Sequence, residues 1–177
     1  GTTMEGLAKL KPAFRLNGSV TAGNASGLND GAAALLVCSQ KFLEGTDFKP
    51  LAKIKASAIA GVEPKIMGIG PVYAIRKLLD KTGLTLDAIE IIEINEAFSV
   101  QVLACLRELG IADDDKRVNP NGGAIALGHP LGMSGSRILL TAARQLKRQQ
   151  KRYAIVSMCI GVGQGYATLI ENPYFAL

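Results

Sequence analysis

The single histidine of the chain, His129, lies in a glycine-rich segment, residues 122–135, with the sequence GGAIALGHPLGMSG. Glycine lets the backbone approach a bound molecule closely and adopt φ angles that other residues avoid. Proline follows the histidine, and a helix is predicted from Ser134, so we expect His129 in a tight loop. Its imidazole, with a pKa of about 6.5, can exchange protons near neutral pH. A lone histidine is more often structural than catalytic, but this loop favours catalysis.

Two more polar groups follow apolar, strand-like runs. Cys159 comes after residues 153–158 and begins a second glycine-rich segment, CIGVGQG, while Asn95 comes after residues 89–94. Backbone N–H groups of such a glycine segment can stabilise a thiolate or a developing oxyanion. Taken alone, Asn95 is better explained as a helix cap. Together, an imidazole, a thiol and a carboxamide supply the groups for acid–base chemistry at a carbonyl.

The elements that must position these groups alternate between strands and helices from residue 51 onward, which predicts a layered α/β fold. A short connection at 159–165 implies that the last two strands are antiparallel, so we expect a mixed, five-stranded sheet covered by helices. The predicted strands are 32–39, 51–62, 89–94, 153–158 and 166–170. The predicted helices are 5–10, 40–45, 71–82, 97–109 and 134–149.

Length and composition limit the classes of protein that this chain can represent. Its 177 residues, 48% of them hydrophobic, fit one domain or one domain with part of another. No apolar run is long enough to span a membrane, and no secretory signal is visible at the amino terminus. Three cysteines without paired spacing indicate a reducing compartment, and we expect a cytoplasmic protein. Cys38, in an apolar strand, and Cys105, on an apolar helix face, are expected to be buried thiols.

Charge and motif spacing argue against several ligands. The net charge of +5 is modest, and the basic cluster at 147–152 has no interleaved aromatic residues, which argues against nucleic acid. No histidine, cysteine and carboxylate residues cluster at zinc-ligand spacing, so no metal is expected. The glycines at 161–165 precede a strand rather than a helix, which does not match a dinucleotide-binding motif.

Several segments, taken in order, resemble the thiolase family, the acyl-CoA acetyltransferases that make or cleave a carbon–carbon bond. They are VTAGNASGLNDGA at 20–32, MGIGP at 67–71, NEAF at 95–98, the histidine segment at 122–135 and CIGVGQG at 159–165. Family members are roughly twice this length, and their acyl-accepting cysteine lies in the N-terminal half. The resemblance therefore implies the C-terminal half of the duplicated thiolase fold. Residues 1–45 would be the tail end of the N-terminal half (loop, strand and short helix), and residues 46–177 the C-terminal domain.

The resemblance also implies roles for the polar residues. His129 would activate the nucleophilic cysteine of the other half and help to stabilise the enolate oxygen. Asn95 would hold a water that completes this first oxyanion hole, and Cys159 would be the acid–base for acetyl-CoA. The amide of Gly161 would contribute to a second oxyanion hole. Val162 departs from the triple glycine common in the family, resembles some β-ketoadipyl-CoA thiolases, and is expected to avoid a positive φ.

A further set of positions matches the family's binding site for the pantetheine of coenzyme A: Ser26, Ala22, Leu28, Phe14, Met67 and Phe98. Taken alone, Phe98 and Met67 are equally explained as core residues, and Ser26 as part of a turn. The implied substrate is an acyl-CoA, with no permanently bound cofactor, and the implied reaction is reversible Claisen condensation or thiolysis of 3-ketoacyl-CoA. A ketosynthase would need paired histidines, and a non-catalytic interaction fragment is the other alternative. Without the nucleophile and its N-terminal half, the chain is expected to be inactive alone and to self-associate as a homo-oligomer.

Overall fold

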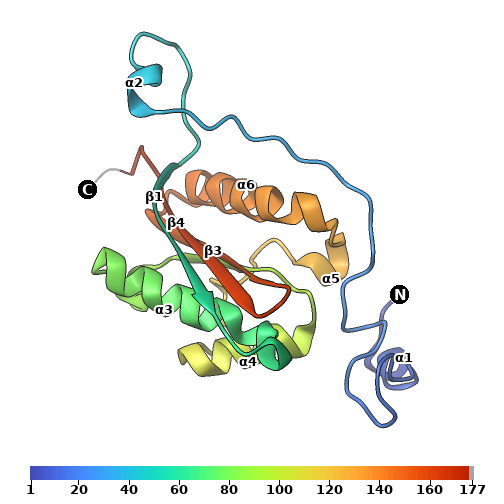
Figure 1. The fold of residues 1–177 in the computed structure, drawn as a ribbon. Coiled ribbons are helices and arrows are strands. Elements are labelled where there is room, and N and C mark those ends of the chain that lie inside the picture. Colours follow the sequence, from blue (N-terminus) through green and yellow to red (C-terminus); the bar gives the residue numbers. More distant parts are fainter. Residues whose placement is uncertain (176–177) are drawn as a thin grey trace.

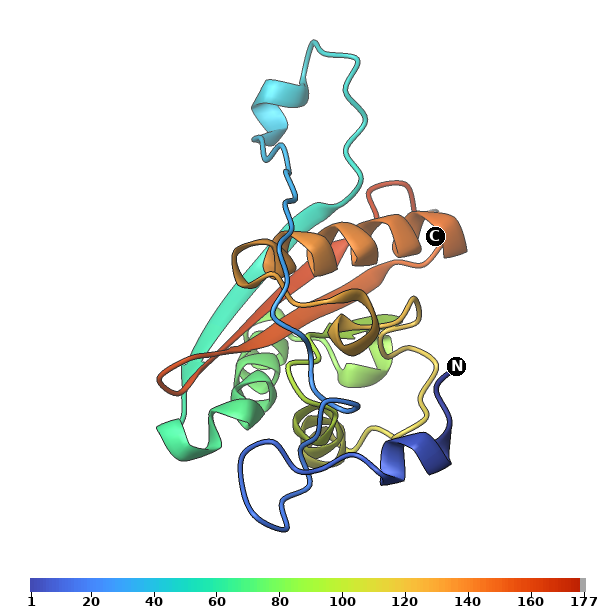
Figure 2. The same ribbon diagram turned by 90° about the vertical axis from the view of Figure 1, so that its right-hand side faces the viewer.

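A computed structural model describes residues 1–175, and its centre is a four-stranded mixed sheet with helices on both faces (Figures 1 and 2). The strands lie in the order β1 (Lys53–Gly61), β4 (Gln164–Glu171), β3 (Tyr153–Ile160) and β2 (Ile91–Ile94). β1 and β4 are antiparallel, as are β4 and β3, whereas β3 and β2 are parallel. The predicted mixed α/β sheet is confirmed. The predicted number of five strands is wrong by one.

The strand predicted at 32–39 does not form. These residues run as an extended trace over the outside of the molecule (Figure 1) and pair with none of the strands among residues 1–175. Leu36 is 76% exposed, and Cys38 is exposed rather than buried as expected. An apolar run becomes a strand only where a neighbour completes its backbone hydrogen bonds, and the local pattern cannot show whether that neighbour is present.

Two short helices flank this extended segment. α1 (Met4–Ala8) begins after Thr3, whose hydroxyl accepts a hydrogen bond from the Gly6 amide. α2 (Gln40–Leu43) begins after Ser39, whose hydroxyl accepts one from the Phe42 amide. Such side-chain caps satisfy N–H groups that a helix start leaves free. Both helices agree with the sequence prediction to within a few residues.

The remaining helices cover the sheet from both sides. α3 (Gly70–Thr82) and α4 (Ser99–Leu109) lie on one face, and α6 (Leu131–Gln149) lies on the other. α6 begins three residues before the predicted start. The short elements are η1 (Pro64–Ile69), η2 (Leu86–Ala88) and α5 (Ala124–Leu127). The last of these forms inside the glycine-rich segment, where no helix was predicted.

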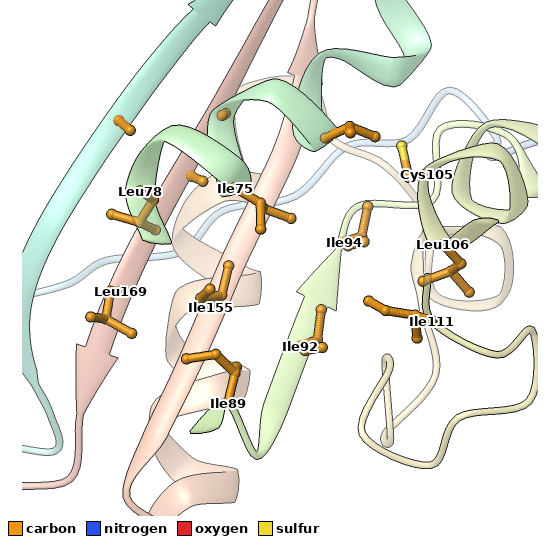
Figure 3. Packing of buried hydrophobic residues seen from close by; sticks show 14 of the residues in the cluster. Ile75, Leu78, Ile89, Ile92, Ile94, Cys105, Leu106, Ile111, Ile155 and Leu169 are labelled. Atoms are coloured by element: carbon orange, nitrogen blue, oxygen red, sulfur yellow. The ribbon is translucent and has the colours of Figure 1, made fainter. Parts of the chain in front are cut away.

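Each face of the sheet has its own apolar core. Figure 3 shows the larger one, where Ile75 and Leu78 of α3 and Leu106 of α4 pack on sheet residues such as Ile155. The smaller core joins α6 to the opposite face, through Ile91, Ile138, Ala142, Ala143, Leu146, Ala154, Val156 and Ile170. All four residues of β2 are buried, as expected for a strand covered on both faces. Cys105 is buried, as predicted.

No helix among residues 1–175 is both long enough and apolar enough to cross a membrane. The feature of the fold that matters for chemistry is the parallel pair β2 and β3. Parallel strands bring their carboxyl ends to the same edge of the sheet. That edge is where Asn95 and Cys159 occur in the sequence.

Candidate active site

Asn95 and Cys159 lie at the carboxyl ends of β2 and β3. Ile94 is level with Ser157, and the backbone N–H of Asn95 donates to the Ser157 carbonyl at 3.0 Å, which extends the ladder by one residue. Cys159 follows two residues later on β3. Both side chains are buried, with 1% exposure for Asn95 and 8% for Cys159. The structure thus places a carboxamide and a thiol at one edge of the sheet, as the sequence predicted.

His129 joins this edge through Asn95. The His129 Nε2 atom lies 3.2 Å from the Asn95 Nδ2 atom, and the His129 Nδ1 atom lies 2.6 Å from the Ser134 Oγ atom. Ser134 is fully buried, and its hydroxyl also donates to the Pro130 carbonyl at 3.0 Å. Sequence reasoning gave Ser134 no role in the site. Its position in the first turn of a helix, five residues after a loop histidine, was the available signal.

The histidine loop is held from outside by the segment that carries Asn29. The Asn29 Oδ1 atom accepts a hydrogen bond from the His129 backbone N–H at 3.1 Å. Gly128, with a φ of 97°, allows this contact, because a Cβ there would lie 2.8 Å from the same oxygen. Leu28, Asn29, Asp30, His129 and Leu131 together line an open hollow of about 390 Å³. Asn29 was missed as a site residue, although it lies within a segment that resembles the family.

A second support fixes the loop before His129. The Glu96 carboxylate accepts hydrogen bonds from the Asn119 side chain at 3.1 Å and from the Ile125 amide, in the first turn of α5, at 3.2 Å. The Asn119 carboxamide also bonds both backbone groups of Ile94, each at 2.9 Å. These contacts attach the glycine-rich segment to the end of β2. They hold the segment that contains His129 close to Asn95.

The protonation states of the two titratable site residues differ from those of free side chains. Burial lowers the pKa of His129, and the Arg137 guanidinium lowers it further, so the imidazole is neutral at neutral pH. Burial raises the pKa of the Cys159 thiol. The glycine amides beside Cys159 therefore do not produce a thiolate at rest. The site combines a neutral base with a protonated acid.

A buried carboxyl group, which the sequence analysis did not consider, lies beneath the site. Glu93 of β2 is 1% exposed, and its pKa is raised to about 7, chiefly by burial, with Arg137 opposing and Glu96 adding to the rise. Its Oε1 atom has no hydrogen-bond partner among residues 1–175, and neither do the Asn95 Oδ1 atom or the Nε and Nη1 atoms of Arg137. The only sequence signal was one charged residue within an apolar strand.

The turn between β3 and β4 differs from expectation. Val162 has a φ of 62°, in the left-handed region that a β-branched residue was expected to avoid, and its side chain is 81% exposed. Gly163, with a φ of 90°, packs against the backbone of Val62 and Pro64. Gly161 is exposed, two residues after Cys159. The turn therefore leaves the Gly161 amide at the end of β3, beyond the thiol.

Three of the predicted pantetheine contacts come together at the start of α4. The Ser26 amide and hydroxyl donate to the Ala97 carbonyl at 3.0 and 3.1 Å, and Ala25 forms a β-bridge with Phe98. The Phe14 ring meets the Phe98 ring edge-on, with centroids 6.1 Å apart. Phe98 and Ser26 are partly buried, and Phe14 is exposed.

The other three predicted contacts are more dispersed. Leu28 is 95% exposed at the hollow beside His129, and Ala22 is exposed in the turn before Asn24. Met67 is half-buried in η1, which is attached to α4 because the Cys105 thiol donates to the Gly68 carbonyl at 3.3 Å. Among residues 1–175, no group of three or more histidine, cysteine, aspartate or glutamate residues could hold a metal ion.

Comparison with known proteins gives matches along nearly the whole chain. The family model "Thiolase, C-terminal domain" matches residues 48–172, and "Thiolase, N-terminal domain" matches residues 1–41. The β-ketoadipyl-CoA thiolase of Acinetobacter baylyi is 61% identical over 171 residues, which cover 97% of this chain and 43% of that protein. The 3-oxoadipyl-CoA/3-oxo-5,6-dehydrosuberyl-CoA thiolase of Escherichia coli K12 is 56% identical over the same shares.

Solved structures show the same relationship. Human mitochondrial 3-ketoacyl-CoA thiolase, in complex with CoA, superposes with a TM-score of 0.93 at 50% identity. That match covers 97% of this chain and 43% of the human chain. The chain thus spans less than half the length of the relatives that it matches.

Proposed function

The chain belongs to the thiolase family, and on this premise we propose that it forms the C-terminal part of an acyl-CoA acetyltransferase. The reaction is reversible Claisen condensation and thiolysis of 3-ketoacyl-CoA. The observation that carries the proposal is the hydrogen bond between His129 and Asn95 at the sheet edge that also holds Cys159. A neutral base, a hydrogen-bonding carboxamide and a protonated thiol at one edge match the proton transfers that this reaction requires.

The resemblance places the acyl-accepting cysteine outside this chain, in the N-terminal half of the enzyme. In cleavage, the neutral His129 imidazole takes the proton of that thiol at Nε2, and the resulting thiolate attacks the 3-keto carbonyl. The acyl–cysteine bond forms as the carbon–carbon bond to the acetyl-CoA unit breaks, which leaves the enolate of acetyl-CoA. The lowered pKa of His129 keeps the ring available as a base at neutral pH. Asn95 holds the water that, with His129, stabilises the enolate oxygen. Its unpartnered Oδ1 atom supports this role, because a buried amide oxygen needs a donor.

Cys159 transfers the proton at the α-carbon of the acetyl unit. In cleavage, its thiol donates a proton to the α-carbon of the departing acetyl unit. In condensation, its thiolate removes the proton from the same carbon. Burial keeps the resting thiol protonated, which is the form that donates a proton in cleavage. The exposed Gly161 amide beyond Cys159 contributes to the second oxyanion hole.

The substrate is an acyl-CoA, bound without a permanent cofactor. The cluster of Ser26, Phe14 and Phe98 provides an apolar surface with one hydroxyl, which suits a pantetheine chain. The CoA complex of human mitochondrial 3-ketoacyl-CoA thiolase supports this assignment. The names of the bacterial relatives support a β-ketoadipyl-type acyl group.

The other partners are the N-terminal half of the same protein and further copies of the enzyme. Spanning 43% of its relatives, the chain contributes His129 and Cys159 to a site that the N-terminal half completes. We expect the assembled enzyme to be a homo-oligomer. Its three free thiols suit a reducing compartment, and we place it in the cytoplasm.

Acyl labelling and condensation can be separated experimentally in the intact enzyme. Cys159→Ala should retain covalent labelling by radioactive acyl-CoA, because the nucleophile and His129 are untouched. Condensation should fall by about 10²–10⁴, the usual contribution of a positioned acid–base. Cys38→Ala, which removes an exposed thiol, is the control and should leave both unchanged. Loss of labelling together with condensation, or full condensation activity in Cys159→Ala, would overturn the proposal.

A further inference from the structure

We propose that Ser134 is a positioning residue that sets the tautomer of His129, placing the ring proton on Nδ1 and leaving Nε2 as the unprotonated, basic nitrogen. The effect of this tautomer on catalysis rests on the function proposed above. The tautomer itself is a property of this chain and can be measured without any assay of that function.

The first observation is the hydrogen bonding of the Ser134 hydroxyl. Its Oγ atom lies 2.6 Å from His129 Nδ1 and 3.0 Å from the Pro130 carbonyl, one turn earlier in α6. A hydroxyl has one proton to donate and lone pairs with which to accept. When that proton goes to the Pro130 carbonyl, as in the structure, the contact with His129 must be a hydrogen bond from Nδ1–H to Oγ. The ring proton of a neutral imidazole is then on Nδ1.

The second observation comes from the opposite side of the ring. His129 Nε2 faces the Asn95 Nδ2 atom at 3.2 Å, and an amide nitrogen donates but does not accept. Nε2 must therefore be the unprotonated nitrogen. The two neighbours, one on a helix and one at a strand end, favour the same tautomer independently. A ring held from both sides is also fixed in orientation.

Burial strengthens the hydrogen bond between Ser134 and His129, because water cannot compete for it. Ser134 is fully buried, so water does not replace its hydroxyl, and an unpaired polar group there would be costly. The Pro130 carbonyl, one turn earlier in the helix, accepts the hydroxyl proton, so the Oγ lone pairs are available to the ring N–H. When Nε2 takes a proton, Nδ1–H retains its acceptor, so the imidazolium keeps its place.

The chain offers a clean test because His129 is its only histidine. We would label the chain with ¹⁵N and record the imidazole nitrogen chemical shifts above the pKa of the ring. The wild type should show a protonated Nδ1 and an unprotonated Nε2. In Ser134→Ala, the Nδ1 proton loses its acceptor, and the shifts should move toward the Nε2–H form. Ser134→Thr keeps the hydroxyl and should restore the wild-type shifts.

Ser136→Ala is the matched control, since it makes the same change in the same helix at a residue with no hydrogen bond to the ring among residues 1–175. Its shifts should equal those of the wild type. A wild-type ring protonated on Nε2 would overturn the proposal, even if every variant failed to fold. Unchanged shifts in a folded Ser134→Ala would overturn it as well.

Kinetics of the intact enzyme provide a second measurement. Ser134→Ala should lower kcat/KM for thiolysis by roughly ten- to a hundred-fold, by analogy with the loss of a partner that orients a metal-ligating histidine. Ser134→Thr should recover most of that activity. Full activity in Ser134→Ala would show that the tautomer does not limit the reaction. An inactive wild type with the predicted imidazole shifts would contradict the proposed function and leave the tautomer assignment standing.

Discussion

The Asn29 side-chain oxygen accepts the backbone N–H of His129 at 3.1 Å, across 100 residues of sequence. The same oxygen lies 2.8 Å from the place that a Cβ on Gly128 would take, so the Asn29 carboxamide packs closely against this glycine. The extended segment that begins near Asn29 has little regular structure of its own. Its contact nevertheless helps to hold the backbone of the loop that carries the imidazole.

Asn29→Ala should therefore loosen the His129 loop without unfolding the sheet. The loss of one hydrogen bond, about 1 kcal/mol, should speed amide hydrogen exchange at His129 by roughly five-fold. Asn29→Asp keeps an oxygen at the accepting position and should exchange at the wild-type rate. Equal exchange in Asn29→Ala and the wild type would show that the loop holds its shape without this contact.

The buried Glu93 should make stability depend on pH. Its pKa is about 7 in the folded chain and 4.5 for a free side chain, and the rise comes mainly from burial, which disfavours the charged form. Below pH 4.5 the carboxyl is protonated in both states and imposes no penalty. Between pH 4.5 and about 7 the unfolded chain loses this proton first, so the free energy of unfolding falls as pH rises. Above pH 7 the penalty is complete, at about 3 kcal/mol.

Glu93→Gln removes this titration while keeping the size of the side chain. The variant should match the wild type near pH 4.5 and exceed it above pH 7 by up to about 3 kcal/mol in urea unfolding. Glu44→Gln, at an exposed position, is the control and should leave the pH profile unchanged. A Glu93→Gln profile parallel to that of the wild type would mean that Arg137 compensates the buried charge fully.

The parts of this site that the sequence could predict are those that depend on local patterns. Apolar runs ending in Asn95 and Cys159 identified β2 and β3, and their parallel pairing then brings both residues to one edge. Ser134 and Asn29 lie within the segments that carry the resemblance, but their contacts with His129 depend on the folded arrangement of the loop. Residues 32–39 have a strand pattern, but a strand also needs a neighbour, and composition cannot supply that information.

Val162, with its positive φ, should lower the free energy of unfolding of the chain. A residue with a Cβ in the left-handed region is disfavoured by roughly 1–2 kcal/mol, whereas glycine adopts that region freely but has a more flexible unfolded state. Val162→Gly should therefore raise the free energy of unfolding by about 0.5–1 kcal/mol, measured by urea denaturation. Val162→Ala keeps the Cβ and should gain less. A destabilised Val162→Gly would mean that the exposed valine side chain makes a contact that outweighs the backbone strain.

The extended segment and α2 expose an apolar surface, which we define as Leu36, Val37, Phe42 and Phe48. Each of these side chains is at least half exposed, and the two phenylalanine rings stack with centroids 6.4 Å apart. Exposed apolar side chains of this kind favour association with a second copy. We predict that the chain self-associates through this surface, so that its mass by light scattering rises with concentration. A dimer is expected, because closed two-fold pairing covers both copies.

Leu36→Lys places a charge within this surface and should shift the chain toward the monomer. Leu16→Lys makes the same change at a side chain that is 96% exposed outside the surface, so it should associate like the wild type. Comparing the two variants separates the local apolar contact from the general effect of added positive charge on a chain that already carries a net charge of +5. A wild type that remains monomeric at high micromolar concentration, or equal dissociation of both variants, would show that this surface does not mediate association.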